Sequence, residues 1–429
     1  MNESLSVLLL FSIPGLPLLL AIPVLRSYFP WSIYIALLPV LIILVIEPQL
    51  ISIEIPWLLL GTTFAIDEMS RILLVMSLIA WSISTAFLNK STPILKKERF
   101  SSYFMLTLSG NLGAIIANDL MTFFIFLTLM SYSFYALVVS QNKEHSQYSG
   151  RIYLSFMIIA DLVLFEALLF AALVTDNLGF SVVHSMIVRS SSADLYLIMI
   201  LLGFGMRAGL WPLHFWLKRV FCSSQPAVKT LLGSVVIVTA LLGMLRWLPL
   251  GQITASEIGV SIQGLGVASI LTVIIFSLIQ KHGQSLAMNF IIISGGFYMM
   301  VLGVGLVNPV LWQQYELWAY YFLASFGIGF AGLIIVSEHL ALNNNDLFIQ
   351  ESKPNYLGSK FKAYLNLLSH HFNMSKVSKL FSQLNGRLQS LSSGKIIDNG
   401  EYLLQRWNIA ITLFLLLWVL VVGIVVMNA

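Results

Sequence analysis

The sequence predicts an all-α membrane protein of about twelve transmembrane helices, and three observations lead to this fold class. Of the 429 residues, 58% are hydrophobic and 10% are charged, whereas soluble domains average about 25% charged residues. Apolar stretches of about 20 residues recur along the chain, and each is long enough to cross a bilayer as a helix. The short alternating segments that are typical of a membrane β-barrel are missing from the sequence.

The expected spans follow the apolar runs in chain order, with boundary errors of about three residues. They cover residues 5–25, 31–47, 69–88, 101–117, 120–140, 152–174, 194–217, 226–247, 257–280, 284–307, 317–337 and 407–427. The N-terminus lacks the basic start and the small-residue cleavage site of a secretory signal, so the first run is expected to be retained. The single cysteine, Cys222, excludes an internal disulfide and is interpreted as a small apolar side chain.

The distribution of basic residues predicts how the chain is threaded. If the N-terminus lies outside, the inner segments receive 19 of the 23 Lys and Arg, and the outer loops carry acids such as Glu54 and Asp119. The four basic residues left over are Arg71, Arg189, Arg207 and Arg246. Because cytoplasmic loops carry the excess of Lys and Arg, both termini are expected on the outer face of the inner (cytoplasmic) membrane.

A polar segment divides the chain into three expected parts. They are an eleven-helix bundle over 1–337, a cytoplasmic segment over 338–406 and a last transmembrane helix over 407–429. Within the polar segment, apolar residues recur every three to five positions between basic ones over 359–393. This pattern predicts an amphipathic helix on the inner interface; a short soluble cap helix is the alternative.

The sequence shows none of the usual signals of a soluble enzyme. It has no phosphate-binding loop, no zinc-ligand spacing and no cluster of Cys and His, so we expect no catalytic residue, metal site or cofactor. Ionisable residues inside membrane spans are costly and are therefore candidates for function. These are Asp161, Glu166, Arg207, His214 and Arg246, and for each a purely structural hydrogen bond or ion pair stays open.

The spacing of the two acids and the composition of the seventh span limit the roles that these candidates can have. Asp161 and Glu166 are about 140° apart around a helix, so they do not form an obvious acid pair. The seventh span contains three glycines, then Pro212 and His214, between residues 203 and 217. Proline removes a backbone hydrogen bond, and interrupted membrane helices are tolerated inside protein or beside watery cavities. The pattern predicts a broken seventh helix, with a simple kink and a packed His214 as the alternative.

These residues resemble a known family. The matching residues run from Arg207-Ala208-Gly209 through Pro212-Leu213-His214 and Trp216-Leu217, then Val228-Lys229-Thr230-Leu231-Leu232-Gly233, to Gly243-Met244-Leu245-Arg246; Asp67 and the run Ala117-Asn118-Asp119-Leu120 match as well. The chain is similar to the antiporter-like membrane subunits of respiratory complex I, membrane-bound hydrogenases, formate hydrogenlyase, multi-subunit sodium/proton antiporters and two-component inorganic-carbon pumps. The resemblance implies an inverted-repeat fold and other membrane subunits as partners. Asp119, Lys229, Arg207 and Arg246 are candidates either for an ion path or for structural polar contacts.

Three departures from the family pattern bear on that path. The fifth-span glutamate is replaced by Thr128, the seventh-span lysine by Arg207 and the eighth-span lysine by Val238. A buried lysine can release a proton, whereas arginine stays protonated. No apolar span between 338 and 406 matches the family's second broken helix, so the second repeat is expected to be incomplete.

Two functions are therefore weighed. The first is a degenerate antiporter-like subunit that mainly scaffolds a larger energy-coupling complex, without catalytic chemistry of its own. The second is a working subunit that moves protons or another small ion, such as sodium, by a rearranged route through Asp161, Glu166, Arg207 and His214. An unrelated transporter or membrane enzyme is a third possibility. Other subunits and lipid are the expected partners, and nucleic acid is not.

Overall fold

The computed structural model describes residues 3–27, 32–46, 51–55, 62–90, 97–140, 144–279 and 286–343, and these are mostly helical. The helices are α1 (Glu3–Leu20), α2 (Pro23–Ser27), α3 (Ser32–Ile46), α4 (Glu68–Lys90), α5 (Lys97–Ile116), α6 (Leu120–Val139), α7 (Glu144–Val174), α8 (Phe180–Ile187), α9 (Ala193–Ala208), α10 (Phe215–Ser223), α11 (Pro226–Leu231), the π-helix η1 (Leu232–Ile237), α12 (Val238–Trp247), α13 (Ser256–Ile279), α14 (Leu286–Val307) and α15 (Pro309–Asn343). The expected interfacial helix over 359–393 and the last expected span over 407–427 lie outside the described residues.

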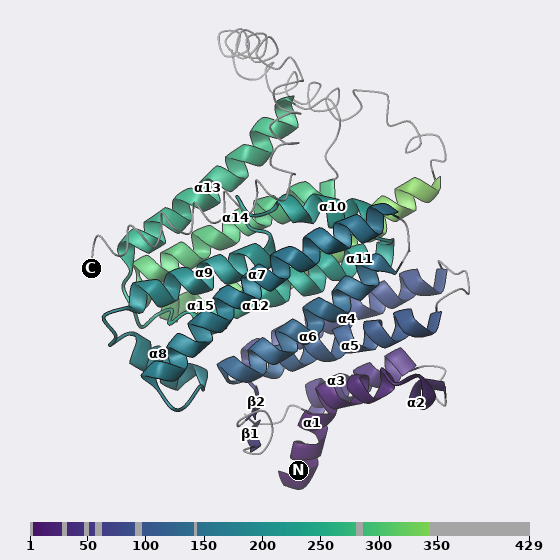
Figure 1. Cartoon of the computed structure of the whole chain (residues 1–429), viewed down its shortest axis with the longest axis horizontal. Coiled ribbons are helices and arrows are strands. Elements are labelled where there is room, and N and C mark those ends of the chain that lie inside the picture. Colours follow the sequence, from purple (N-terminus) through teal and green to yellow (C-terminus); the bar gives the residue numbers. More distant parts are fainter. Residues whose placement is uncertain are drawn as a thin grey trace.

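Within these ranges, seven helices are long and apolar enough to cross a membrane. They are α4, α6, α7, the continuous unit formed by α11, η1 and α12, and α13, α14 and α15. Shorter apolar helices lie within α1 and α3. The long helices run roughly side by side, with α13 and α14 along one edge and α1 to α3 along the opposite edge (Figure 1).

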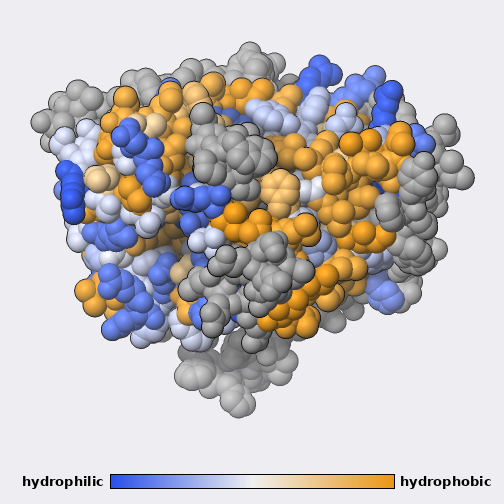
Figure 2. Space-filling model, turned by 90° about the horizontal axis from the view of Figure 1, so that it is seen from below, coloured by the Kyte–Doolittle hydropathy of each residue, from blue (hydrophilic) through white to orange (hydrophobic). Residues whose placement is uncertain are grey.

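The outer surface of the bundle carries many large apolar side chains. Leu173 is 86% exposed, Val45 73% and Leu8 71%, and Figure 2 shows broad apolar areas broken by hydrophilic patches. Since lipid tails solvate such side chains as well as a protein core does, this surface fits helices that stand in a bilayer.

The helix at the centre of the bundle is the unit Pro226–Trp247, and in its most apolar 18-residue window 94% of the residues are buried. It packs against α4, α9 and α15. Its middle, Leu232–Ile237, is π-helical, a local widening that proteins often place at functional positions. The Tyr298 hydroxyl, from α14, donates to the carbonyl oxygen of Leu241 in the same unit at 2.5 Å.

A short β-hairpin was not among the predicted elements. Strands β1 (Ile51–Ile55) and β2 (Thr62–Ile66) pair antiparallel, with Ile53 opposite Phe64. The sequence Ile-Ser-Ile-Glu-Ile alternates β-branched and polar residues, which favours a strand with one buried face. Each strand has only five residues, so apolar runs of about twenty residues do not reveal it. The all-α prediction therefore did not include these strands.

The hairpin stabilises one end of the bundle. Phe64 forms a bridge with Ala117 and Asp119 forms one with Gly179, so the hairpin, the α5–α6 turn and the start of α8 are joined by backbone contacts. In Figure 1, β1, β2 and α8 lie at one end of the bundle, and α10 lies towards the other.

Candidate functional site

The end of α9 and the start of α10 are separated by an irregular stretch. α9 ends at Ala208, and Gly209 follows with φ 62° in the left-handed region, where its N–H bonds to the carbonyl oxygens of Gly205 and Met206. Glycine adopts this conformation without the steric cost that a Cβ would bring. The Trp211–Pro212 peptide bond is cis, and α10 begins at Phe215.

Trp216 connects the two helices across this stretch. Its indole nitrogen donates at 3.0 Å to the Met206 carbonyl oxygen, which also accepts from the Gly209 N–H. This bond ties the last turn of α9 to the start of α10. Its ring also lies edge-on to Tyr153 of α7, with ring centroids 5.4 Å apart. His214 precedes α10 at its N-cap position and stacks on Phe215.

Arg207, in the last turn of α9, is the most deeply buried cation of the described residues. The side chain is 2% exposed. One guanidinium nitrogen, Nη2, forms an ion pair with Asp161 of α7, and the other, Nη1, donates to the Ser131 hydroxyl of α6 at 2.6 Å. Three helices therefore meet at one guanidinium group.

Tyr132 completes the cluster from its outer side. Its hydroxyl donates to the second carboxylate oxygen of Asp161 at 3.0 Å, while the residue as a whole is 42% exposed on the surface of α6. Asp161 thus uses both oxygens, one for arginine and one for tyrosine. Pairing offsets part of the free-energy cost of taking these two charges out of water. The sequence analysis singled out Arg207 and Asp161 as candidates, but not Ser131 or Tyr132.

Glu166 does not belong to this cluster. It lies on the same helix as Asp161, but its side chain is exposed, and it makes no ion pair or hydrogen bond with any described residue. Asp161 is buried and Glu166 is exposed, so the two acids lie on different faces of α7, as their spacing predicts.

Asp119 and Arg246 stabilise the hairpin end of the bundle. Asp119 caps α6: one oxygen accepts from the Thr122 N–H at 2.7 Å and the other from the Thr63 N–H at 2.8 Å. Arg246, at the end of α12, bonds to the Ala117 carbonyl and to the Ser70 hydroxyl. Asp119 thus acts as an N-cap, and Arg246 links α12 to the end of α5 and to α4.

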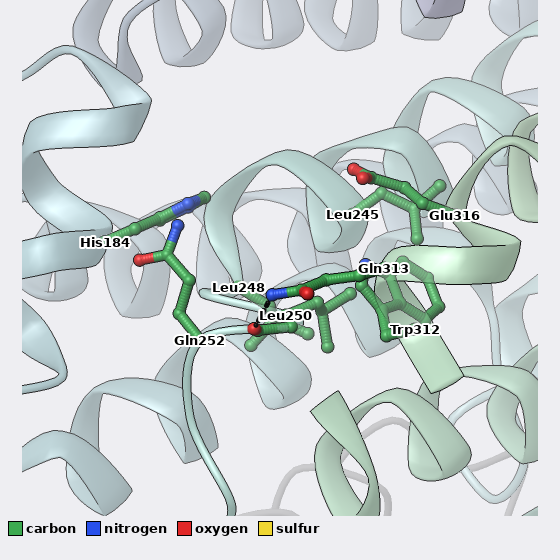
Figure 3. A pocket seen from close by; sticks show the side chains of 9 residues that line it. His184, Leu245, Leu248, Leu250, Gln252, Trp312, Gln313 and Glu316 are labelled. Carbon is green, nitrogen blue, oxygen red and sulfur yellow. Dashed lines mark hydrogen bonds between the residues drawn. The ribbon is translucent and has the colours of Figure 1, made fainter. Parts of the chain in front are cut away.

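Arg246 also contacts His184, which lines a small polar pocket. Its side chain lies 3.7 Å from Asp67, and its carbonyl oxygen lies 3.0 Å from His184 Nε2. His184, Gln252, Gln313 and Glu316 line the pocket, which has a volume of about 200 Å³ (Figure 3). Figure 3 shows the His184 ring and the Glu316 carboxylate pointing into it from opposite sides. Burial lowers the pKa of His184 to about 4.

Two of the positions that depart from the family pattern, Thr128 and Val238, and the family-matching lysine Lys229 lie apart from the Arg207–Asp161 ion pair. The Thr128 hydroxyl donates to the Ile125 carbonyl oxygen of its own helix at 2.8 Å. Val238 is 1% exposed and follows directly on η1. Lys229, in α11, places its ammonium over the Phe221 ring at 5.3 Å. Neither the Thr128 contact nor the Lys229 contact extends the Arg207–Asp161 cluster.

A second buried polar cluster was not predicted. The Asn111 side chain accepts from Ser77 and from the Trp81 indole, each at 3.0 Å, and donates to Thr239 at 2.9 Å. It joins α4, α5 and α12 in the interior. An Asn inside an apolar run is expected to form buried hydrogen bonds, but the sequence does not indicate which residues are its partners.

Among the described residues, no group of three or more His, Cys, Asp or Glu is placed to hold a metal ion.

Comparisons with known proteins agree on the family. A family model described as NADH:quinone oxidoreductase/Mrp antiporter, transmembrane, matches residues 117–346. Hydrogenase-4 component B of Escherichia coli is 21% identical over 48% of this chain and 31% of its own length. A Na(+)/H(+) antiporter subunit of Bacillus subtilis is 26% identical over 35% of this chain and 32% of its own length. The aligned part of this chain thus spans about a third of the length of these two relatives.

A solved structure shows the same fold. A chain of the archaeal membrane-bound sulfane sulfur reductase superimposes with a TM-score of 0.62 at 19% identity, over 76% of this chain and 56% of that one. Together with the family match over more than half of the sequence, this likeness means that the chain belongs to the NADH:quinone oxidoreductase/Mrp antiporter transmembrane family.

Proposed function

We propose that this chain is an antiporter-like subunit that mainly scaffolds a larger energy-coupling membrane complex and does not complete a proton route alone. Its relatives carry names of hydrogenase components and antiporter subunits, which supports other membrane subunits as partners. The chain would lie in the inner membrane with both termini outside, in contact with lipid. We expect no catalytic chemistry, cofactor or nucleic acid of its own.

The observation that carries this proposal is the buried and paired position of the Arg207 side chain. The guanidinium is 2% exposed and bound directly to Asp161 and Ser131. A proton relay needs a group that gains and loses a proton during turnover, and arginine stays protonated in proteins. A lysine at this place could be tuned by burial, but Arg207 holds a constant charge and so acts as a permanent link between α9, α7 and α6.

The finer architecture is part of the same proposal. We infer twelve transmembrane helices, with α9 and α10 as the two halves of a broken seventh helix, and an inverted repeat whose second half is incomplete. The irregular stretch at 209–214 supports the break. We also propose the three-part division at 337 and 406, with an interfacial helix and a last span in the C-terminal part.

One observation favours the alternative, an active translocating subunit. Asp161 faces Arg207 and is reached from the surface through the half-exposed Tyr132. If Asp161 changed its protonation state, the tyrosine could pass a proton towards the surface of α6. Such a route would use the carboxylate as the carrier and leave Arg207 as its counter-charge.

Proton uptake into vesicles, normalised to the amount of assembled complex, separates the two functions. The parent is compared with Arg207→Ala, Arg207→Lys and Asp161→Asn. Scaffolding predicts that Arg207→Ala and Asp161→Asn lower the yield of assembled complex and leave the flux per complex unchanged. Arg207→Lys should partly restore assembly. A fully assembled complex whose flux is abolished by either substitution would establish the translocating function instead.

A further inference from the structure

Glu166 occupies an unusual position in α7. Its side chain is exposed, and the residues before and after it on the same helix face are exposed and apolar: Ile158 42%, Leu162 59%, Phe165 42%, Leu169 47% and Leu173 86%. These positions recur every three to four residues, which is one face of a helix. A single acid therefore lies in the middle of an apolar stripe.

The depth of Glu166 makes this placement costly in lipid. It lies eight residues before the end of α7 at Val174, which is about 12 Å along the helix axis. A bilayer hydrocarbon core is about 30 Å thick, so the carboxyl group is too deep for its short side chain to reach the headgroups. Ionisable groups at such depths face protein or water and pair with one another. Yet no described residue of this chain pairs with Glu166.

We propose that the Ile158–Leu173 face of α7 is the docking surface for a transmembrane helix of another subunit, which presents a Lys or Arg at the depth of Glu166. This inference rests on the proposed function, since it assumes a multi-subunit complex. Charge complementarity identifies the partner: apolar side chains pack along the stripe, and the cation neutralises the acid where lipid cannot.

Two other occupants fit the surface less well. A second copy of this chain, packed through the same face about a two-fold axis, would bring two Glu166 side chains together, and like charges disfavour each other's ionised form. The chain's own segment 407–427 contains no Lys, Arg or His, so it could cover the stripe but could not neutralise the acid.

Cross-linking identifies what covers the stripe. A photo-reactive amino acid is placed at Leu162 in the full chain within native membranes, and at Leu271 on the exposed face of α13 as a control. The proposal predicts a cross-link from position 162 to a transmembrane helix of a different subunit that carries a basic residue. Cross-links only to lipid, to a second copy or to residues 407–427 would overturn it.

Charge reversal then tests the ion pair. Glu166→Lys should lower the recovery of that partner per copy of this chain by about tenfold, and replacing the partner's basic residue with Glu should restore recovery. Glu166→Leu should also lower recovery. If the stripe faces lipid, Glu166→Leu would leave recovery unchanged or raise it, because a polar group has been removed from lipid; that result would overturn the proposal.

Two controls distinguish a loss of docking from misfolding of the variant and from failure of the proposed function. The thermal stability and membrane level of each variant, measured by fluorescence-detected size exclusion, should match the parent, since Glu166 has no partner within the described chain. If no subunit co-purifies with the parent chain, the proposed function itself fails. If the parent complex forms and the Glu166 variants assemble equally well, only the docking inference fails.

Discussion

Arg207 and Asp161 form an ion pair between the end of α9 and the middle of α7, with the guanidinium 2% and the aspartate 7% exposed. Burying either charge alone would cost free energy, and the opposite charge of its partner offsets part of that cost. Both partners are further held by neutral hydroxyls, from Ser131 and Tyr132. The stability of the helix bundle should therefore depend on the pair as a unit.

The first prediction concerns this coupling. Arg207→Met or Asp161→Leu alone should destabilise the purified chain by about 3–5 kcal/mol, because each leaves a buried charge without its partner. The double variant should lose less than the sum of the two single losses. Thermal unfolding of the four proteins in one detergent measures the coupling, and additive losses would show that the two residues do not interact energetically.

The second prediction concerns the turn between α9 and α10. Gly209 has φ 62°, and a Cβ there would also lie 3.4 Å from the Trp216 ring. Gly209→Ala should destabilise the chain by about 1–2 kcal/mol. The matched control is Gly264→Ala on α13, where an added Cβ meets no atom within 4 Å; it should be neutral or stabilising by up to about 1 kcal/mol. Equal melting temperatures for both variants would contradict this.

The third prediction concerns His184. Its folded pKa is about 4, below the value near 6.5 of an unfolded histidine. As the pH falls from about 6.5 towards about 4, the unfolded chain binds a proton that the folded chain does not, so stability is lost through this window. The loss from this group is at most about 3 kcal/mol.

His184→Gln keeps an N–H donor for the Arg246 carbonyl oxygen but does not titrate in this range. Melting temperatures are measured for the parent and the variant at about pH 7.5 and about pH 5. The parent should lose more stability on acidification than the variant, because the carboxylates titrate equally in both. Identical pH dependence would mean that His184 is not held neutral by burial.

The fourth prediction concerns topology. Cys222, in α10, is exposed and belongs to the expected inner side, near Lys218 and Arg219. Glu54, on β1, is exposed and belongs to the expected outer side. An impermeant maleimide applied to intact cells should label Glu54→Cys in a Cys222→Ser background and should not label the parent at Cys222. The opposite labelling pattern would reverse the threading.

The sequence by itself determined the membrane class, because composition and twenty-residue apolar runs depend only on local order. It also located the family motif through Arg207, Pro212 and His214, and it separated Asp161 from Glu166, since helical periodicity follows directly from spacing. The sequence did not predict the pairing of β1 with β2, because each strand is only five residues long.

Only the tertiary structure decided which polar groups meet. Arg207 could have paired with either acid of α7, and the packing of α9 against α7 selected Asp161 and left Glu166 on the outer face. Tyr132 and Asn111 gained their partners in the same way, from helices 29 and 128 residues away in the chain. Such contacts depend on how helices rotate and pack against one another, and side-chain spacing along a single helix does not specify that arrangement.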